Sequence, residues 1–250
     1  WTILHETYEG LGHRVDLLEP VPGLPDMVFA ANGALAIEDR ALGARFREPV
    51  RAREAPAHRR MLAAHGIRVR LPRAINEGEG DFAWTGRHII AGSGFRSSPE
   101  AHLELMETFR VPIIPLELVD PRFYHLDTAL TVINSETIAY YPPAFSPSSR
   151  RRLADCYPDA IIAEDADARV LGLNAVSDGL HVVLAAQAEK LCARIAEAGF
   201  TPVPVDVSEL LKGGGGVKCA TLEIHRRSEP VVAPQGQQAG EQTNIRRSSI

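Results

Sequence analysis

The sequence has few cysteines, and their arrangement excludes two classes of protein. Its 250 residues contain only Cys156, Cys192 and Cys219, which are odd in number and far apart. Disulfide-rich secreted domains use paired, regularly spaced cysteines, and zinc sites commonly contain a C-x-x-C pair. Neither pattern is present, so we expect a reducing compartment, the cytoplasm, with Cys156 and Cys192 serving as packing residues.

Other features that the sequence lacks exclude several classes of binding partner. No apolar run is long enough to cross a bilayer, and no signal peptide is visible. The formal net charge of −5 and a pI near 6.0 argue against nucleic acid as the main partner. The Gly213–Gly216 run lacks the Lys-Ser/Thr ending of a phosphate-binding loop and the Gly-x-Gly-x-x-Gly pattern of a dinucleotide site. The sequence therefore predicts neither a nucleic-acid nor a membrane partner.

The composition is that of a globular protein with a sizeable core, because 45% of the residues are hydrophobic and 24% are charged. The chain opens at Trp1 inside what reads as a helix, so we expect that an N-terminal segment precedes it. Residues 226–250 contain no aromatic side chain and are rich in Gln, Ser, Arg, Gly and Pro. We predict that this tail is disordered.

A repeat organises the chain. A helix-like segment that ends in a helix breaker, followed by a β-rich run, occurs five times, with runs at residues 11–18, 65–71, 109–116, 157–163 and 198–205. The runs start about 54, 44, 48 and 41 residues apart, a spacing typical of repeat architectures. Shorter strands follow each run, for example 81–84 with 88–91. Such units cannot bury a core alone, so we predict five ββαβ units in a ring, an α/β propeller; an open α/β sheet is the alternative.

Polar or reactive residues occupy corresponding loops of these units, each before the next strand. They are Asn32, Glu77, Glu79, Asp81, His125, Asp127, Asn174 and Cys219. Each alone has an ordinary explanation, such as a solvated acidic turn, a core histidine, an Asx turn or a buried thiol. Because the loops of a ring converge at one end, we predict that they form one site.

This set of side chains favours a cationic ligand. Buried carboxylates need a cation, a proton or a metal, and a guanidinium satisfies two of them through forked hydrogen bonds. A thiol with an imidazole is a nucleophile with an acid/base partner, and the neighbouring Lys218 would favour the thiolate of Cys219. His125 and Asp127 are two residues apart, so on a strand they point the same way. Arg96 either binds a substrate carboxylate or is a surface arginine before a helix.

Four segments in order resemble the guanidine-modifying (pentein) superfamily. They are Met-Val-Phe-Ala-Ala-Asn at 27–32, Glu-Gly-Glu-Gly-Asp at 77–81, Phe-Tyr-His-Leu-Asp-Thr at 123–128 and Gly-Gly-Gly-Val-Lys-Cys at 214–219. Bacterial dimethylarginine dimethylaminohydrolases and arginine dihydrolases are the most similar members. The resemblance runs from about Trp1 to Ile224. It implies one five-bladed catalytic domain over residues 1–225, with no metal and no organic cofactor.

The resemblance also implies a mechanism. Cys219 would attack the guanidinium carbon of arginine or a methylated arginine and form a thiouronium intermediate. His125 would protonate the departing amine and then activate water, and Glu77 (with Glu79 as the alternative) and Asp127 would grip the guanidinium. The product would be citrulline. The substrate-binding residues so implied are Phe29, Asn32, Asp81, Arg96, Asp127 and Asn174, with Arg96 holding the amino-acid carboxylate.

One departure concerns the substrate. Deiminases and many dimethylargininases have Asp where this chain has Asn32, and asparagine there resembles the arginine dihydrolases, which release ornithine. A dihydrolase or deiminase acting on arginine is therefore the alternative activity. A non-catalytic binding module on the same fold is the alternative of another class. The expected partner is a small guanidino compound, and a homodimer is an open hypothesis.

Overall fold

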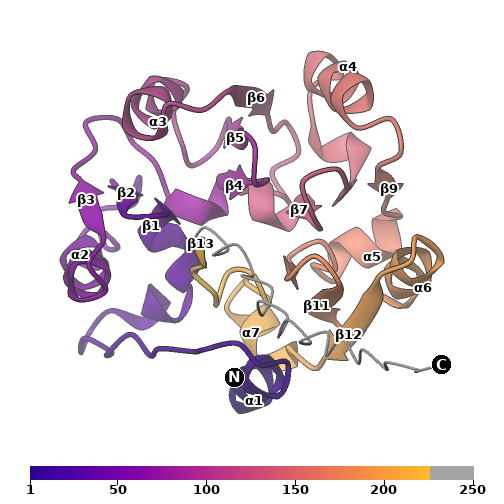
Figure 1. Ribbon diagram of the computed structural model, residues 1–250, viewed down its shortest axis with the longest axis horizontal. Coiled ribbons are helices and arrows are strands. Elements are labelled where there is room, and N and C mark those ends of the chain that lie inside the picture. The colour runs from indigo at the N-terminus through magenta and orange to yellow at the C-terminus, as the bar shows by residue number, and fades with distance from the viewer. Residues whose placement is uncertain (226–250) are drawn as a thin grey trace, which may run out of the picture.

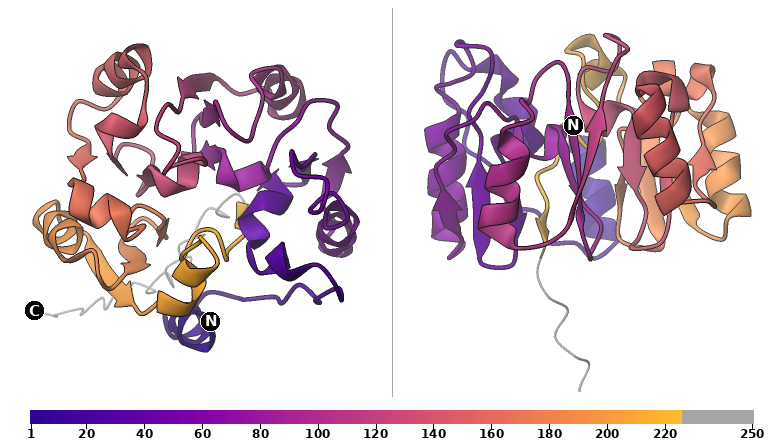
Figure 2. Two further views of the ribbon diagram at one scale, coloured as in Figure 1. Left: turned by 180° about the vertical axis from the view of Figure 1, so that it is seen from behind. Right: turned by 90° about the horizontal axis from the view of Figure 1, so that it is seen from above.

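The computed structural model describes residues 1–225 of the chain. Its strands form four small sheets that lie around a central region, with α2, α3, α4 and α6 on the outside (Figure 1). The two views of Figure 2 show the same arrangement from behind and from above. The predicted disorder of residues 226–250 lies outside the described residues. Among the described residues, no helix is long and apolar enough to span a membrane.

The helices and strands are short. The helices are α1 (Thr2–Gly10), α2 (Ala55–Ala64), α3 (Ala101–Phe109), α4 (Pro147–Cys156), α5 (Asp165–Arg169), α6 (Glu189–Glu197) and α7 (Ser208–Lys212). The strands are β1 (Ala34–Ile37), β2 (Arg40–Gly43), β3 (Arg68–Arg70), β4 (Phe82–Trp84), β5 (Ile89–Ser93), β6 (Ile113–Glu117), β7 (Leu130–Val132), β8 (Ile138–Tyr140), β9 (Ile161–Ile162), β10 (Val176–Ser177), β11 (His181–Ala185), β12 (Thr201–Val205) and β13 (Ile224–His225). The 3₁₀ helices are η1 (Pro25–Val28), η2 (Ala30–Gly33), η3 (Gly78–Gly80), η4 (Leu126–Thr128) and η5 (Pro142–Ala144).

One strand pattern recurs in all four sheets. Two strands pair antiparallel, the chain crosses through a helix, and a third strand pairs parallel with the middle one. In the second sheet β4 and β5 are antiparallel, α3 follows, and β6 is parallel to β5. The other sheets are β1-β2-β3 with β13 added beside β1, β7-β8-β9, and β10-β11-β12. The predicted ββαβ unit is therefore present four times in the described part of the chain.

Two strand predictions were wrong. The run at 11–18 forms no strand, because strands exist only by pairing, and within residues 1–225 no backbone group of residues 14–20 bonds to another backbone group. The strand expected directly after Cys219 is shorter and begins later than its place in the repeat implies. Only Ile224–His225 pair, parallel to the end of β1, and residues 217–220 form a turn instead.

Local sequence signals explain the helix ends in part. Ser146 caps α4 by accepting a hydrogen bond from the Ser149 amide, with Pro147 in the first helical position. The Ser98–Glu100 stretch forms a turn rather than the first residues of α3, which begins at Ala101. Cys192 on α6 packs against the largest core cluster, as predicted, whereas Cys156 is exposed.

The core positions the loops. The largest cluster of buried apolar side chains joins the β4, β7 and β10 sheets and includes Phe123, Phe145 and Leu126. The 3₁₀ helices η2, η3 and η4 each precede the first strand of a sheet, η2 contacts η3, and η3 contacts η4. The loops that carry the reactive residues thus meet at the middle of the molecule (Figure 1).

Candidate active site

The thiol of Cys219 lies in a buried polar pocket formed by three loops. Its Sγ lies 3.3 Å from Asp127 Oδ2, which accepts its hydrogen bond, and Asn174 Nδ2 donates to Sγ at 3.1 Å. The Cys219 amide donates to Asn174 Oδ1 at 3.0 Å, so this one amide side chain holds both the thiol and its backbone. A Cβ on Gly216 would lie 2.9 Å from Asn174 Oδ1, which explains why glycine is needed there. The predicted meeting of Cys219, Asp127 and Asn174 is therefore present.

His125 and Glu77 form the second pair of the site. His125 Nε2 lies 2.7 Å from Glu77 Oε2, and Arg96 Nη1 lies 3.5 Å from the same oxygen. The Arg47 amide donates to the other oxygen at 3.1 Å. Both carboxylate oxygens of Glu77 are thus engaged by protein groups. This geometry suits a carboxylate that orients the imidazole, whereas the resemblance implied a carboxylate that grips the guanidinium.

The charges around His125 set its protonation. Burial lowers the pKa of His125, but the carboxylates of Asp81, Glu77 and Asp127 outweigh burial, and the net pKa lies above its ordinary value. Burial would raise the pKa of Glu77, but the hydrogen bond and charge of His125, helped by Arg96, lower it to about 2. The interaction therefore favours the imidazolium and the carboxylate over the neutral forms of the pair.

The thiol and its acceptor are shifted the other way. Burial raises the pKa of Asp127 to about 6, although the charge of His125 opposes the shift. Burial, followed by the charge of Asp127, raises the pKa of Cys219 well above its ordinary value. Without a bound cation, the resting site therefore holds a neutral thiol.

The structure corrects the expectation for Lys218. Its Nζ lies 2.6 Å from Glu79 Oε2 and 2.5 Å from Glu223 Oε2, and the charges of these carboxylates raise its pKa despite burial. The cation is therefore balanced by two carboxylates instead of serving the thiol. Glu79 also accepts a hydrogen bond from the Glu223 amide at 2.9 Å, so it belongs to this separate ionic cluster and not to the His125 pair.

The other predicted residues surround the pocket. Asn32 Oδ1 accepts from Arg51 Nη1 at 2.8 Å, which leaves the buried Nδ2 without a partner in the described residues. Asp81 Oδ1 accepts from the Leu126 amide at 3.1 Å and so fixes the η4 turn. Phe29 packs against the glycine run, where a Cβ on Gly215 would lie 2.3 Å from its ring.

Sequence reasoning missed two residues. The buried Arg51 fixes the orientation of the Asn32 amide and pairs with Glu54 at 2.8 Å. Nothing in its local sequence marks it, since it lies among other charged residues. Tyr124 lies beside His125, with ring centroids 5.0 Å apart, and Arg96 Cζ lies 4.8 Å from the centre of the Tyr124 ring. An aromatic residue next to a candidate acid/base histidine was the available signal.

No group of three or more His, Cys, Asp or Glu side chains within residues 1–225 could hold a metal ion. The site instead offers a thiol, an imidazole and the carboxylate of Asp127, whose Oδ1 has no hydrogen-bond partner among the described residues. An unpartnered buried carboxylate oxygen beside a thiol can accept an N–H donor of a cationic ligand. The arrangement can therefore bind a cation and attack it.

Comparison with known proteins agrees with this chemistry. No protein-family model matches the chain. It is 55% identical over 225 residues to an N(G),N(G)-dimethylarginine dimethylaminohydrolase of Mycobacterium tuberculosis, a match that covers 90% of this chain and 74% of the relative. The chain belongs to the dimethylarginine dimethylaminohydrolase family. It is a hydrolase.

Proteins named as arginine dihydrolases are also similar to this chain. A bifunctional arginine dihydrolase/ornithine cyclodeaminase of Synechocystis is 35% identical over 238 residues, covering 93% of this chain and 33% of the relative. The solved N-terminal domain of the arginine dihydrolase ArgZ, which holds a covalently bound reaction intermediate, has a TM-score of 0.87 at 34% identity, covering 90% of this chain and 85% of that chain. A dimethylarginine dimethylaminohydrolase adduct with S-methyl-L-thiocitrulline has a TM-score of 0.74 at 20% identity, over 88% of this chain and 86% of that one, and shows the fold alone.

Proposed function

We propose that this protein hydrolyses the guanidino C–N bond of a methylated arginine through a covalent Cys219 intermediate and releases citrulline and an amine. The observation that carries the proposal is the thiol of Cys219 held between Asp127 and Asn174, in the same buried site as a His125–Glu77 ion pair. A relative 55% identical that is named a dimethylarginine dimethylaminohydrolase supports the choice of substrate.

Binding of the guanidinium uses Asp127. Its Oδ1 has no partner among the described residues, and its Oδ2 is in contact with the thiol, so a guanidinium that bonds to Asp127 lies against Sγ. The cation also favours the ionised form of both groups, which lowers the raised pKa of Asp127 and that of Cys219. Substrate binding would thus help to create the thiolate that attacks it.

Proton transfers use His125. Binding of the cation releases the thiol proton to solvent, and the Sγ thiolate forms a bond to the guanidinium carbon. His125 begins as the imidazolium that Glu77 stabilises, and it gives its proton to the departing amine as the C–N bond breaks. The neutral imidazole then takes a proton from water, and the hydroxide attacks the thiouronium carbon. As the C–S bond breaks, the hydroxyl proton of the intermediate passes to the departing thiolate, which restores the thiol and releases citrulline.

A second candidate is an arginine dihydrolase that continues to ornithine. Arg51 holds Asn32 Oδ1, so the Asn32 amide presents its NH₂ group to the site, against Gly80 and close to the His125 ring. A carboxylate there would be another acceptor for a guanidinium, whereas an N–H donor suits the ureido oxygen of citrulline and would favour a second hydrolysis. The bifunctional dihydrolase relatives support this alternative.

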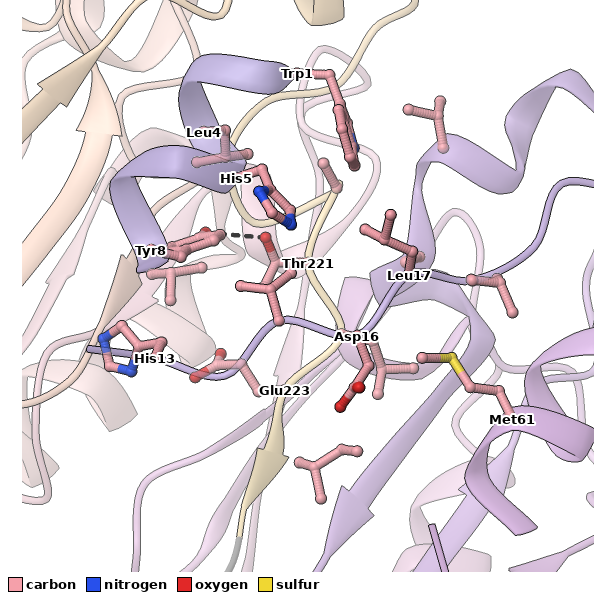
Figure 3. Close-up of a pocket in the computed structure, with 18 of the residues that line it drawn as sticks. Trp1, Leu4, His5, Tyr8, His13, Asp16, Leu17, Met61, Thr221 and Glu223 are labelled. Carbon is pink, nitrogen blue, oxygen red and sulfur yellow. Dashed lines mark hydrogen bonds between the residues drawn. The ribbon is translucent and has the colours of Figure 1, made fainter. Parts of the chain in front are cut away.

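We also propose that the fold is the five-bladed propeller that the resemblance implies. Residues 13–18 follow α1 as a third strand follows its helix in each sheet, and residues 220–225 follow the Cys219 loop as a first strand would. Between them lies a cavity of about 1170 Å³ lined by α1, residues 11–21 and residues 220–225 (Figure 3). A strand lying in this cavity would pair with both segments, as the middle strand does in each of the four sheets. In the protein purified from its natural source, amides 14–20 should resist hydrogen exchange; fast exchange would contradict a fifth sheet.

A cytoplasmic location and a homodimer remain part of this proposal. Cell fractionation with an antibody against the protein tests the location, and recovery in the membrane or secreted fraction would contradict it. Sedimentation equilibrium tests the dimer, which a monomer mass at working concentration would exclude.

Mass spectrometry of products decides the activity. The purified protein is incubated separately with asymmetric dimethylarginine and with arginine, and Cys219→Ser serves as the control. Citrulline with dimethylamine supports the proposal, whereas ornithine from arginine establishes the dihydrolase. No product from either substrate, or products retained in Cys219→Ser, would overturn the covalent mechanism. Intact-protein mass after a rapid acid quench should show the thiouronium adduct in the wild type alone.

A further inference from the structure

The reactive groups are closed off from solvent. The exposed fractions are 5% for Cys219, 3% for His125 and 5% for Asp127. Neither the 1170 Å³ cavity nor a second cavity of about 160 Å³ beside α2 has any of these three residues in its lining. A ligand the size of arginine therefore reaches Sγ only after part of the surrounding rim moves.

The rim consists of the glycine run at 213–216 and the half-buried side chains of Phe29, Arg96 and Tyr124. Phe29 packs against Gly213 and Gly215 from one side. Tyr124 lies on the other side, where its hydroxyl donates to the Gly214 carbonyl oxygen at 3.3 Å. The Tyr124 ring also contacts the ring of the neighbouring His125 and the guanidinium of Arg96. Tyr124 thus links the loop of the acid/base histidine to the loop of the nucleophile.

The glycine run is the part of the rim that can move. Gly213 and Gly214 are exposed, and Gly214 has φ of +84°, a conformation that suits glycine. The amides of Gly213, Gly214 and Gly215 bond only to carbonyls of α7, which directly precedes them. Within residues 1–225, the Tyr124–Gly214 bond is the one hydrogen bond that ties these three glycines to a distant part of the chain.

We propose that Tyr124 is the gate residue of this enzyme: its hydrogen bond to Gly214 holds the Gly213–Gly216 run closed over Cys219, and its release admits the substrate guanidino group. Tyr124 takes no part in bond making. Burial raises the pKa of Tyr124, so the phenol stays a protonated donor across the working pH range. The identity of the substrate rests on the proposed function, whereas the gate itself does not.

The gate makes a quantitative prediction. If only the open form admits a ligand, apparent affinity and thiol reactivity both scale with the open fraction. Loss of one neutral hydrogen bond should raise that fraction about fivefold. Tyr124→Phe removes the hydroxyl and keeps the ring against His125 and Arg96, so it isolates the hydrogen bond from the packing.

The test measures alkylation of Cys219 by iodoacetamide, followed by peptide mass mapping. We expect the Cys219 rate to rise about fivefold in Tyr124→Phe, at each of two pH values, because a change in access is independent of the thiol pKa. The exposed Cys156 is an internal reference in the same sample and should react at an unchanged rate. The matched control is Tyr141→Phe, which removes a hydroxyl bonded to Asp165 at 2.7 Å and should leave Cys219 unchanged.

Turnover supplies the second readout. We expect KM to fall about as much as alkylation rises, with kcat within about threefold of the wild type. An unchanged Cys219 alkylation rate in Tyr124→Phe would overturn the gate, as would a hundredfold loss of kcat with no gain in alkylation, which would assign the hydroxyl to the chemistry. Alkylation needs no turnover, so a wild type that forms no citrulline would overturn the proposed function and leave the gate test valid.

Discussion

His125 and Glu77 form a buried ion pair, with Nε2 and Oε2 2.7 Å apart and the Glu77 side chain fully inaccessible to solvent. Each residue shifts the other toward its charged form, so the pKa of Glu77 falls to about 2 while that of His125 rises. A general acid must carry its proton before the leaving group departs, and this pairing favours the protonated form of His125. The first prediction tests the pair directly.

Glu77→Gln should move the pH dependence of turnover toward acid. The substitution removes the charge that holds the proton on His125, so the imidazolium is lost at lower pH and the alkaline limb of kcat shifts down. We expect kcat at pH 7.5 to fall about 10- to 100-fold, because an amide can still hold the ring. NMR titration of His125 gives its pKa in both proteins. An unchanged His125 pKa in the variant would contradict the pairing.

Asp127→Asn should stabilise the protein while it abolishes activity. Because folding raises the Asp127 pKa to about 6, its ionisation favours the unfolded state. The cost is absent below the unfolded-state value near 4, grows as pH rises from there to about 6, and is fully present at higher pH. Replacement by a neutral amide should therefore raise the free energy of unfolding by up to about 3 kcal/mol at pH 7.5, and far less at pH 4.

Urea unfolding of the wild type and Asp127→Asn at both pH values measures this difference. Glu77 provides the matched comparison, because its lowered pKa has the opposite sign: its contribution to stability is present above pH 4.5 and is lost as pH falls toward about 2. Equal stability gains at pH 4 and pH 7.5 would show that the Asp127 effect does not come from its ionisation.

The same loops show how far sequence reasoning reached. The reactive residues could be assigned to corresponding loops because each precedes a strand at the same place in a repeat, and the ββαβ unit itself was legible from helix breakers and β-rich runs. Residues 11–18 carry the same signal and still form no strand, because a strand depends on a neighbour that one segment's sequence does not contain.

The direction of side chains was the second feature that the sequence could not predict. Lys218 adjoins Cys219 in sequence, but its long side chain reaches Glu79 and Glu223 instead, since adjacency along a chain does not set where a four-carbon side chain ends. The roles of Glu77 and Glu79 were equally open from the sequence. They diverge in space because a 3₁₀ turn between them points one carboxylate at His125 and the other at Lys218.

Gly216→Ala should impair the nucleophile without disturbing the rest of the fold. The added Cβ would lie 2.9 Å from Asn174 Oδ1, which holds the Cys219 amide, so either the loop or Asn174 must shift. We expect kcat to fall at least about tenfold, since misplacement of a reacting atom by 1 Å can cost about a hundredfold. Gly10→Ala, where a Cβ meets no atom within 4 Å, is the control and should retain full activity. Equal kcat in the two variants would contradict the role of Asn174.

Lys218→Met should destabilise the protein strongly, although Lys218 is outside the chemistry. The substitution leaves the carboxylates of Glu79 and Glu223 without the cation they share, and breaking a buried ion pair costs about 3–5 kcal/mol. Adding Glu79→Gln removes one of the two unpaired charges, so the double variant should recover part of that loss, which a double-mutant cycle in urea measures. If the two substitutions were simply additive, the cluster would not be coupled.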